Sequence, residues 1–235
     1  MKQDLRNIDV VILVGGLSTR LRPVIGDTPK CLAPINGKAF IDIQIDYLIK
    51  QGFQRFILCV GHKANRVREH IESREKGEFI FSIESSPLGT GGAIIFAMKK
   101  IKSKVFFVLN GDSYFPIDLK SLYDFHLQNK PDITIAGKHM ENPDRYGIIL
   151  VNTENRVVGF KEKGSQDNAI INGGVYVISI NTLMREKMPE VFSFEKEILQ
   201  RQYHQKKIYC FPFNEYFVDI GVPTEFSKAN QDLQF

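Results

Sequence analysis

The chain has 235 residues, of which 43% are hydrophobic and 25% are charged, and its formal net charge is +4. This composition is typical of a soluble globular protein and excludes disordered, collagen-like and coiled-coil chains. The small positive excess does not by itself indicate nucleic-acid binding, although it suits an anionic small substrate.

The sequence predicts neither a membrane span nor a secretion signal. The longest apolar run near the start, Val10–Val14, ends at Gly15-Gly16 and is far shorter than the roughly 20 residues that a membrane span needs. The histidines and cysteines lack the spacing of metal ligands, and the cysteines are scattered at Cys31, Cys59 and Cys210. Such cysteines are typical of reduced thiols, so we expect a cytoplasmic protein with no membrane partner.

In the first part of the chain, apolar runs of strand length alternate with segments of helical period. Strands are expected over 10–14, 56–60, 79–83 and 105–109, and helices from Phe40 to Gly52 and over 63–73 and 91–101. Continuous apolar strands separated by helices indicate a parallel sheet that is covered on both faces. Ligands bind beyond the carboxyl ends of such strands, where the Gly15-Gly16 turn and Asp112 are expected.

The pattern changes near residue 132. Short strands are expected over 133–136, 146–151, 157–161 and 175–178, followed by a helix over 194–204, a strand over 208–211 and a short tail. Ser193-Phe194-Glu195 is interpreted as a helix cap with its packing residue. No linker or repeat divides the chain, so we expect one α/β domain over 1–235, a Rossmann-like doubly wound mixed sheet with halves of about 8–131 and 132–235.

The most informative stretch follows the first strand. Leu13 leads into Gly15-Gly16, and Ser18-Thr19-Arg20 and later Pro29-Lys30 follow. Small residues let backbone N–H groups approach a phosphate chain, while Arg20 and Lys30 supply the charges to neutralise it. Alone, a double glycine turn with surface cations is common. The stretch has neither the Walker spacing nor that of the dinucleotide-binding fingerprint.

Together these residues resemble the signature of the sugar-1-phosphate nucleotidyltransferases, L-A-G-G-x-G-T-R-L followed by P-K. Val14 stands where alanine is usual and Ser18 where glycine is common, and neither change removes a charged group. Further segments match in the family's order: Glu84–Gly92, Asn110-Gly111-Asp112, Tyr146-Gly147, Glu162-Lys163, Asn172-Gly173-Gly174 and Asp219–Pro223. The resemblance spans roughly residues 8–225.

The resemblance implies a GT-A-like nucleotidyltransferase fold without a C-terminal β-helix, a nucleotide-binding first half and a sugar-phosphate-binding second half. It implies catalytic roles for Arg20, Lys30, Asp112 and Lys163. The implied nucleotide-binding residues are Leu13, Gly15, Gly16, Ser18, Thr19, Glu84, Pro87, Gly89 and Thr90. The implied sugar-phosphate-binding residues are Asn110, Tyr146, Gly147, Glu162, Lys163 and Asn172.

Asp112 and Asp219 are the expected ligands of Mg²⁺. Either aspartate alone has an ordinary interpretation as a turn cap or a solvated loop residue. Two carboxylates that meet at one sheet edge supply the hard oxygen ligands that Mg²⁺ prefers, and the ion takes its other ligands from water and substrate phosphates. Without a cation, the same pair would repel the phosphates.

The expected reaction joins a nucleoside triphosphate to a sugar 1-phosphate and releases pyrophosphate. Glu84 can accept two hydrogen bonds from guanine, which favours GTP. Pro87–Ala93 most resembles the D-glycero-D-manno-heptose 1-phosphate guanylyltransferases, which serve surface-polysaccharide synthesis. Mannose-1-phosphate guanylyltransferases and N-acetylmuramate-1-phosphate uridylyltransferases remain alternatives.

Two other classes of function are alternatives to an enzyme. A non-catalytic, nucleotide-sensing subunit would tolerate the loss of charged groups that are all present here. Nucleic-acid binding would need a clustered basic face, whereas Arg66–Arg68 and Lys99-Lys100 fit solvated helix faces. Phe211, Phe213 and Phe217 could mark a homo-oligomer interface, although such aromatics more often belong to a core.

Overall fold

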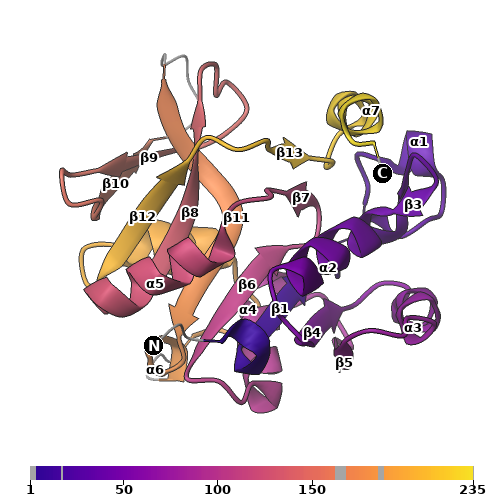
Figure 1. Ribbon diagram of the computed structural model, residues 1–235, viewed down its shortest axis with the longest axis horizontal. Helices are drawn as coiled ribbons and strands as arrows, with labels where there is room; N and C mark the ends of the chain where they lie inside the picture. The colour runs from indigo at the N-terminus through magenta and orange to yellow at the C-terminus, as the bar shows by residue number, and fades with distance from the viewer. Residues whose placement is uncertain (1–3, 17, 162–167, 185–187, 235) are drawn as a thin grey trace.

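The computed structural model describes residues 4–16, 18–161, 168–184 and 188–234, and every structural statement concerns these residues. A nine-stranded mixed sheet runs through them (Figure 1). Its strands are β1 Asp9–Leu13, β4 Arg55–Val60, β5 Glu78–Ile83, β6 Val105–Asn110, β8 Ile133–Met140, β9 Ile148–Val151, β10 Val157–Lys161, β11 Ala169–Ser179 and β12 Ile208–Phe213. Seven follow the order β10-β9-β11-β6-β1-β4-β5, while β8 pairs with β11 and β12.

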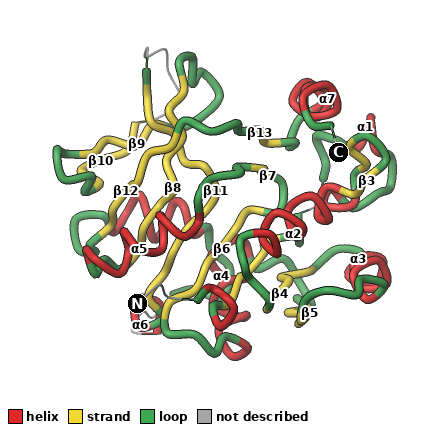
Figure 2. The backbone as a smooth tube through the Cα atoms, in the orientation of Figure 1, coloured by secondary structure: helices red, strands yellow, loops and turns green. Residues whose placement is uncertain are grey.

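Helices and two small ladders surround this sheet (Figure 2). The α-helices are α1 Arg22–Ile25, α2 Phe40–Lys50, α3 Ala64–Glu72, α4 Gly89–Ala97, α5 Leu119–Asn129, α6 Asn181–Met184 and α7 Pro223–Asp232, and a π-helix spans Phe194–Gln200. The ladders pair β2 Pro34–Ile35 with β3 Lys38–Ala39, and β7 Ser113–Tyr114 with β13 Val218–Asp219. Within the described ranges, no helix has both the length and the apolar character needed to cross a bilayer.

The parallel part of the sheet is covered on both faces. β1 pairs in parallel with β4 and β6, and β4 pairs in parallel with β5. Val10 and Ile12 belong to a core with α2, α3 and α5, whereas Val11 belongs to a second core with α4 and the π-helix. Because successive residues of a strand face opposite sides, burial on both sides requires an unbroken apolar run. The predicted parallel, doubly covered sheet is confirmed.

Strand β11 makes the sheet mixed and connects its two parts. Residues 175–179 of β11 pair antiparallel with β6, while Ile171 pairs with Ile148 of β9. The same strand pairs with β8, and the register shifts between Asn172 and Tyr176. Strand β11 of the second half therefore continues the sheet of the first half directly.

Several element boundaries differ from those predicted. Helix α5 was not predicted, although Asp118 caps it through the N–H groups of Lys120 and Ser121, and α7 occupies the expected tail. The predicted strands over 133–136 and 175–178 are too short, because pairing of β8 with β11 extends both into more polar sequence. The helix from residue 194 is π-helical through Gln200. Phe213 belongs to the core and packs on Phe115 and Phe211, while Phe211 and Phe217 are partly buried and pack against that core.

Candidate active site

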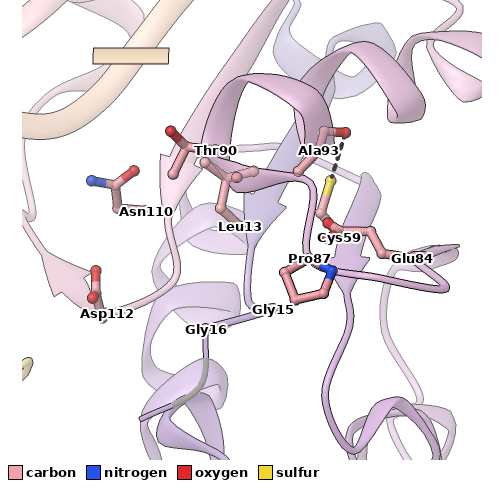
Figure 3. A pocket seen from close by; sticks show the side chains of 11 residues that line it. Leu13, Gly15, Gly16, Cys59, Glu84, Pro87, Thr90, Ala93, Asn110 and Asp112 are labelled. Atoms are coloured by element: carbon pink, nitrogen blue, oxygen red, sulfur yellow. Dashed lines mark hydrogen bonds between the residues drawn. The ribbon is translucent and has the colours of Figure 1, made fainter. Parts of the chain in front are cut away.

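A cavity of about 310 Å³ lies where the carboxyl ends of β1 and β6 diverge into their loops (Figure 3). The chain leaves β1 toward β4 on one side and later places β6 on the other, so this is the switch point of the sheet. Eleven residues line the cavity: Leu13, Gly15, Gly16, Cys59, Glu84, Pro87, Gly89, Thr90, Ala93, Asn110 and Asp112. Glu84 and Pro87 stand at one end of this view, and Asn110 and Asp112 at the other.

The glycine turn after β1 forms one wall of the cavity. A Cβ atom on Gly15 would lie 3.3 Å from the backbone nitrogen of Gly61 and 3.8 Å from Glu84 Oε1. A side chain at this position would therefore crowd the turn beside the Glu84 carboxylate. The absence of one leaves the backbone accessible to a ligand.

Ser18 and Thr19 do not line the cavity, although the sequence predicts both as nucleotide-binding residues. Ser18 has a φ of 56° and accepts a hydrogen bond of 3.0 Å at Oγ from the Lys30 backbone N–H. Its carbonyl accepts from the N–H groups of Leu21 and Arg22. Ser18 thus connects the glycine turn to the segment that carries Lys30, and Thr19 is exposed beside it.

Glu84 is a half-buried carboxylate at the end of β5. Its Oε2 accepts a hydrogen bond of 3.2 Å from the Leu88 backbone N–H, so the loop that leads into α4 orients it. Burial raises the pKa of Glu84, and the hydrogen bond from Leu88 lowers it. Its Oε1 remains beside the glycine turn, where it can accept hydrogen bonds from a ligand in the cavity.

The first turn of α4 is held by the segment before the π-helix. The carbonyl of Phe192 accepts hydrogen bonds from the N–H groups of Gly91 and Gly92, and the Phe192 N–H donates to Leu88 O. A Cβ on Gly91 would lie 2.1 Å from the Phe192 ring, so glycine permits this close approach. The Thr90 hydroxyl donates to Glu195 Oε2 at 2.6 Å and accepts from the Phe194 N–H at 2.9 Å.

Asp112 and Asp219 are brought together by the ladder of β7 with β13. Asp219 pairs with Ser113, and the Ile220 N–H donates to the Asp112 carbonyl at 2.9 Å. Burial raises the pKa of Asp219, and the neighbouring charge of Asp112 raises it further. The Gly221 N–H, which donates to Asp219 Oδ1 at 2.8 Å, and the cations Lys30 and Arg20 act in the opposite direction.

Two predicted cations lie beside this carboxylate pair. Lys30 Nζ lies 2.7 Å from Asp112 Oδ2, and its side chain is largely buried. Arg20 is an exposed residue whose Nη2 would lie 3.4 Å from a Cβ on Gly221, next to Asp219. The two acids and two bases therefore form one cluster at the end of the cavity that Asp112 lines. No group of three or more histidine, cysteine or acidic side chains that could hold a metal occurs within the described parts of the chain.

The structure describes only some of the residues that are predicted to bind the sugar phosphate. The Tyr146 ring packs edge-on against Phe217, and its pKa is raised to about 12, first by burial and then by Asp219, Glu225 and Asp112. Gly147 follows it as an exposed residue immediately before β9. Asn172 donates to the Tyr176 hydroxyl at 2.8 Å and accepts from the Gly174 N–H, so its polar atoms already support the fold. Glu162 and Lys163 lie outside the described residues.

Sequence reasoning missed several residues of this region. Cys59 and Ala93 line the cavity. No charge or motif distinguishes Cys59, whereas Ala93 ends the Pro87–Ala93 run and could have been included with it. Glu195 was interpreted only as part of a helix cap. Ser193 is indeed the cap and accepts from the Lys196 N–H, but Glu195 stands one position too early for the reciprocal bond of a capping box. This spacing indicates that the Glu195 carboxylate has a partner other than the Ser193 backbone N–H.

The sequence profile of the nucleotidyl transferase family matches residues 9–234. The chain belongs to that family. The transferase is 41% identical over 228 residues to D-glycero-alpha-D-manno-heptose 1-phosphate guanylyltransferase from Aneurinibacillus thermoaerophilus, a match that covers 97% of this chain and 99% of the relative. It is also 41% identical to the protein of that name from Campylobacter jejuni, with 93% and 97% of the two chains covered.

A solved structure supports the same assignment. The structure of HddC from Yersinia pseudotuberculosis complexed with GMP-PN matches the transferase with a TM-score of 0.87 and 37% identity. The match covers 97% of this chain and 100% of the other. The predicted mixed α/β nucleotidyltransferase fold is therefore confirmed.

Proposed function

We propose that this transferase is a D-glycero-α-D-manno-heptose 1-phosphate guanylyltransferase. It transfers a guanylyl group from GTP to the heptose 1-phosphate and releases GDP-heptose and pyrophosphate for surface-polysaccharide synthesis. The observation that carries the proposal is the cluster of Asp112, Asp219, Lys30 and Arg20 at one end of a nucleotide-sized cavity. The two 41% identical relatives support the choice of substrates.

The reaction is an in-line substitution at the α-phosphorus. An oxygen of the sugar 1-phosphate forms the new P–O bond while the bond to the β-phosphate oxygen breaks, and pyrophosphate leaves with that electron pair. The attacking phosphate is already ionised at neutral pH, so no general base is required. Positioning and charge neutralisation therefore supply most of the catalysis.

Lys30 and Arg20 are proposed to neutralise the phosphates. Lys30, held by Asp112 and by the hydrogen bond of its backbone N–H to Ser18, is placed to stabilise charge at the α-phosphate. Arg20 is exposed at the outer side of the cluster, where its guanidinium can bind the departing pyrophosphate with two parallel hydrogen bonds. Two cations at separate positions suit a reaction that divides one phosphate chain into two.

Asp112 and Asp219 are proposed to hold Mg²⁺. Their oxygens are hard ligands, and burial and the charge of Asp112 raise the pKa of Asp219, so a cation at the pair would stabilise the ionised carboxylate. Two carboxylates are enough, because Mg²⁺ usually keeps waters and takes phosphate oxygens as further ligands. When bound, the ion would supply positive charge to donor and acceptor oxygens.

Glu84 is proposed to select guanine. A carboxylate with a free oxygen can accept hydrogen bonds from N1–H and the 2-amino group of guanine, whereas uracil and thymine offer one edge N–H. Leu88 fixes the Glu84 side chain at the cavity wall. The HddC complex with GMP-PN supports a guanine nucleotide in a related protein of the same fold.

The second half of the chain is proposed to bind the acceptor. Tyr146, Gly147 and Asn172 are the proposed contacts within the described residues of this half, and Asn110 at the end of β6 joins them from the first half. Glu162 and Lys163 complete the predicted set. In this division, residues of about 8–131 bind the nucleotide and those of about 132–235 bind the sugar phosphate. The three free, buried cysteines support a cytoplasmic location, because thiols stay reduced there.

A substrate matrix tests the proposal. Purified protein with Mg²⁺ is incubated with GTP, UTP, CTP, dTTP or ATP and with heptose, mannose, glucose or N-acetylmuramate 1-phosphate, and pyrophosphate release is measured. We expect the highest kcat/KM for GTP with heptose 1-phosphate and almost none for Asp112→Asn. Preference for mannose 1-phosphate, or for UTP with N-acetylmuramate 1-phosphate, would replace the proposed substrates by those alternatives. Binding without turnover for every pair would indicate a nucleotide-sensing subunit.

A further inference from the structure

Gln44 is a buried polar residue to which neither the sequence motifs nor the reaction assigns a role. It lies in the middle of α2, and its side chain is 1% exposed. Its Nε2 donates to the carbonyl of Asn110 at 2.9 Å and to the carbonyl of Ser113 at 2.6 Å. These two carbonyls stand on either side of Gly111-Asp112.

This arrangement matches the chemistry of a primary amide. The NH₂ group of an amide can donate one proton to each of two carbonyls from a single uncharged nitrogen. Gln44 Oε1 has no hydrogen-bond partner among the described residues. The amide therefore leaves its buried oxygen unsatisfied while its nitrogen makes two hydrogen bonds. An unsatisfied buried oxygen destabilises a fold, and an apolar residue of the same length would avoid that cost.

The turn that Gln44 spans is fixed from its other sides by backbone contacts. The Gly111 N–H donates to Leu13 O at 3.0 Å, and Asp112 O accepts from the Ile220 N–H. A Cβ on Gly111 would lie 2.5 Å from Leu13 O, so the turn lies directly against the end of β1. Gln44 supplies the contact from the helix layer, and its side chain binds the carbonyls at both ends of the turn.

We propose that Gln44 is a positioning residue that holds the Asn110–Ser113 turn and thereby sets the location of the Asp112 carboxylate relative to Asp219. A loosened turn would let Asp112 move away from Asp219 and from Lys30 Nζ, which lies 2.7 Å from it. The effect falls on the requirement for the divalent cation more than on nucleotide binding, because the hydrogen bonds of Gln44 go to Asn110 and Ser113 and, among the described residues, none goes to Glu84 or the glycine turn. The expected effect on the cation requirement rests on the proposed function.

Gln44→Met tests the proposal, because methionine keeps the length of the side chain and removes both donors. Ile45→Val is the matched control, since Ile45 is a fully buried neighbour on α2. Hydrogen exchange of residues 111–114 is measured in the metal-free proteins. We expect exchange in Gln44→Met to be at least about tenfold faster, with β4 and β5 unchanged and with no such change in Ile45→Val.

The second readout is the Mg²⁺ concentration that gives half-maximal turnover. For Gln44→Met we expect it to rise about tenfold, while the KM for GTP changes less than about threefold. Unchanged exchange at 111–114, or equal changes in both variants, would overturn the proposal. If Gln44→Met does not fold, Gln44→Asn, which is one methylene too short to reach both carbonyls, gives the same comparison. Because exchange needs no turnover, failure of the proposed function would leave the first readout decisive.

Discussion

Thr90 and Glu195, 105 positions apart in the sequence, are joined by a hydrogen bond of 2.6 Å from the Thr90 hydroxyl to the Glu195 carboxylate. Thr90 lines the nucleotide-sized cavity, and Glu195 belongs to the first turn of the π-helix. The same carboxylate oxygen accepts from the Ser193 hydroxyl at 2.9 Å. The wall of the cavity is therefore held in place by a segment of the second half of the chain.

Replacing Glu195 by alanine should weaken nucleotide binding. Thr90 would lose its acceptor, so we expect the KM for GTP to rise about tenfold, equivalent to about 1.4 kcal/mol, with kcat within about threefold. Steady-state kinetics of Glu195→Ala, Thr90→Val and the double variant measure the coupling. The double variant should be little worse than Thr90→Val alone, and Thr90→Ser should retain wild-type KM. Fully additive losses would show that the two residues act independently.

Asp219→Asn and Asp112→Asn should both abolish most turnover but should differ in stability. Burial and the Asp112 charge raise the pKa of Asp219, so its ionised form opposes folding at neutral pH. Without metal, Asp219→Asn should therefore be more stable by about 1 kcal/mol, and this gain should vanish as the pH falls below about 4. Asp112→Asn should show no gain, because Lys30 loses its ion-pair partner.

Thermal unfolding in EDTA, together with pyrophosphate release in Mg²⁺, checks both expectations. Asp124→Asn serves as the control, since this carboxylate is largely exposed on α5. It should change neither quantity. Equal stability of the Asp219 and Asp112 variants would contradict the expectation that the ion pair with Lys30 makes the Asp112 carboxylate less costly to the fold than that of Asp219.

Glu84→Gln should reduce discrimination between nucleotides. The amide can present one acceptor oxygen in place of a carboxylate, so we expect the GTP-over-UTP ratio of kcat/KM to fall about tenfold to a hundredfold. The pKa of Glu84 is raised by burial, so kcat/KM for GTP should decline on acidification at a pH above that of an ordinary glutamate. This acid limb should be absent in the variant. An unchanged ratio would remove Glu84 from base recognition.

His126 should make the fold sensitive to acid. It is buried between Thr134 Oγ1, at 2.9 Å, and Ser179 Oγ, at 3.0 Å, and burial lowers its pKa from 6.5 to about 4. The unfolded chain binds a proton more readily, so stability is lost as the pH falls from 6.5 to about 4, by about 3 kcal/mol in total. Urea unfolding of the wild type and His126→Gln at several pH values measures this, and the variant should show a shallower dependence. Parallel curves would contradict the assignment.

The sequence by itself determined the parallel sheet and the family. The apolar run of Val10–Val14 and its counterparts 56–60 and 105–109 require burial on both faces, and only a sheet between two helix layers provides this. The order of the glycine turn, Pro29-Lys30 and Asn110-Gly111-Asp112 identified the nucleotidyltransferase pattern, because such motifs depend on local backbone geometry. Two predicted strands were too short because pairing with a distant strand extends them into polar sequence, as in β8 and β11.

Tertiary structure alone decided which distant residues meet. The β7–β13 ladder places Asp219 next to Asp112, the Phe192 carbonyl fixes the start of α4, and Gln44 reaches the turn at Ser113 from another layer. None of these contacts is encoded by periodicity or spacing, since each depends on how separate elements pack. Local sequence selects the elements and their buried faces, whereas the distances between side chains of the site follow from the packing of the whole sheet.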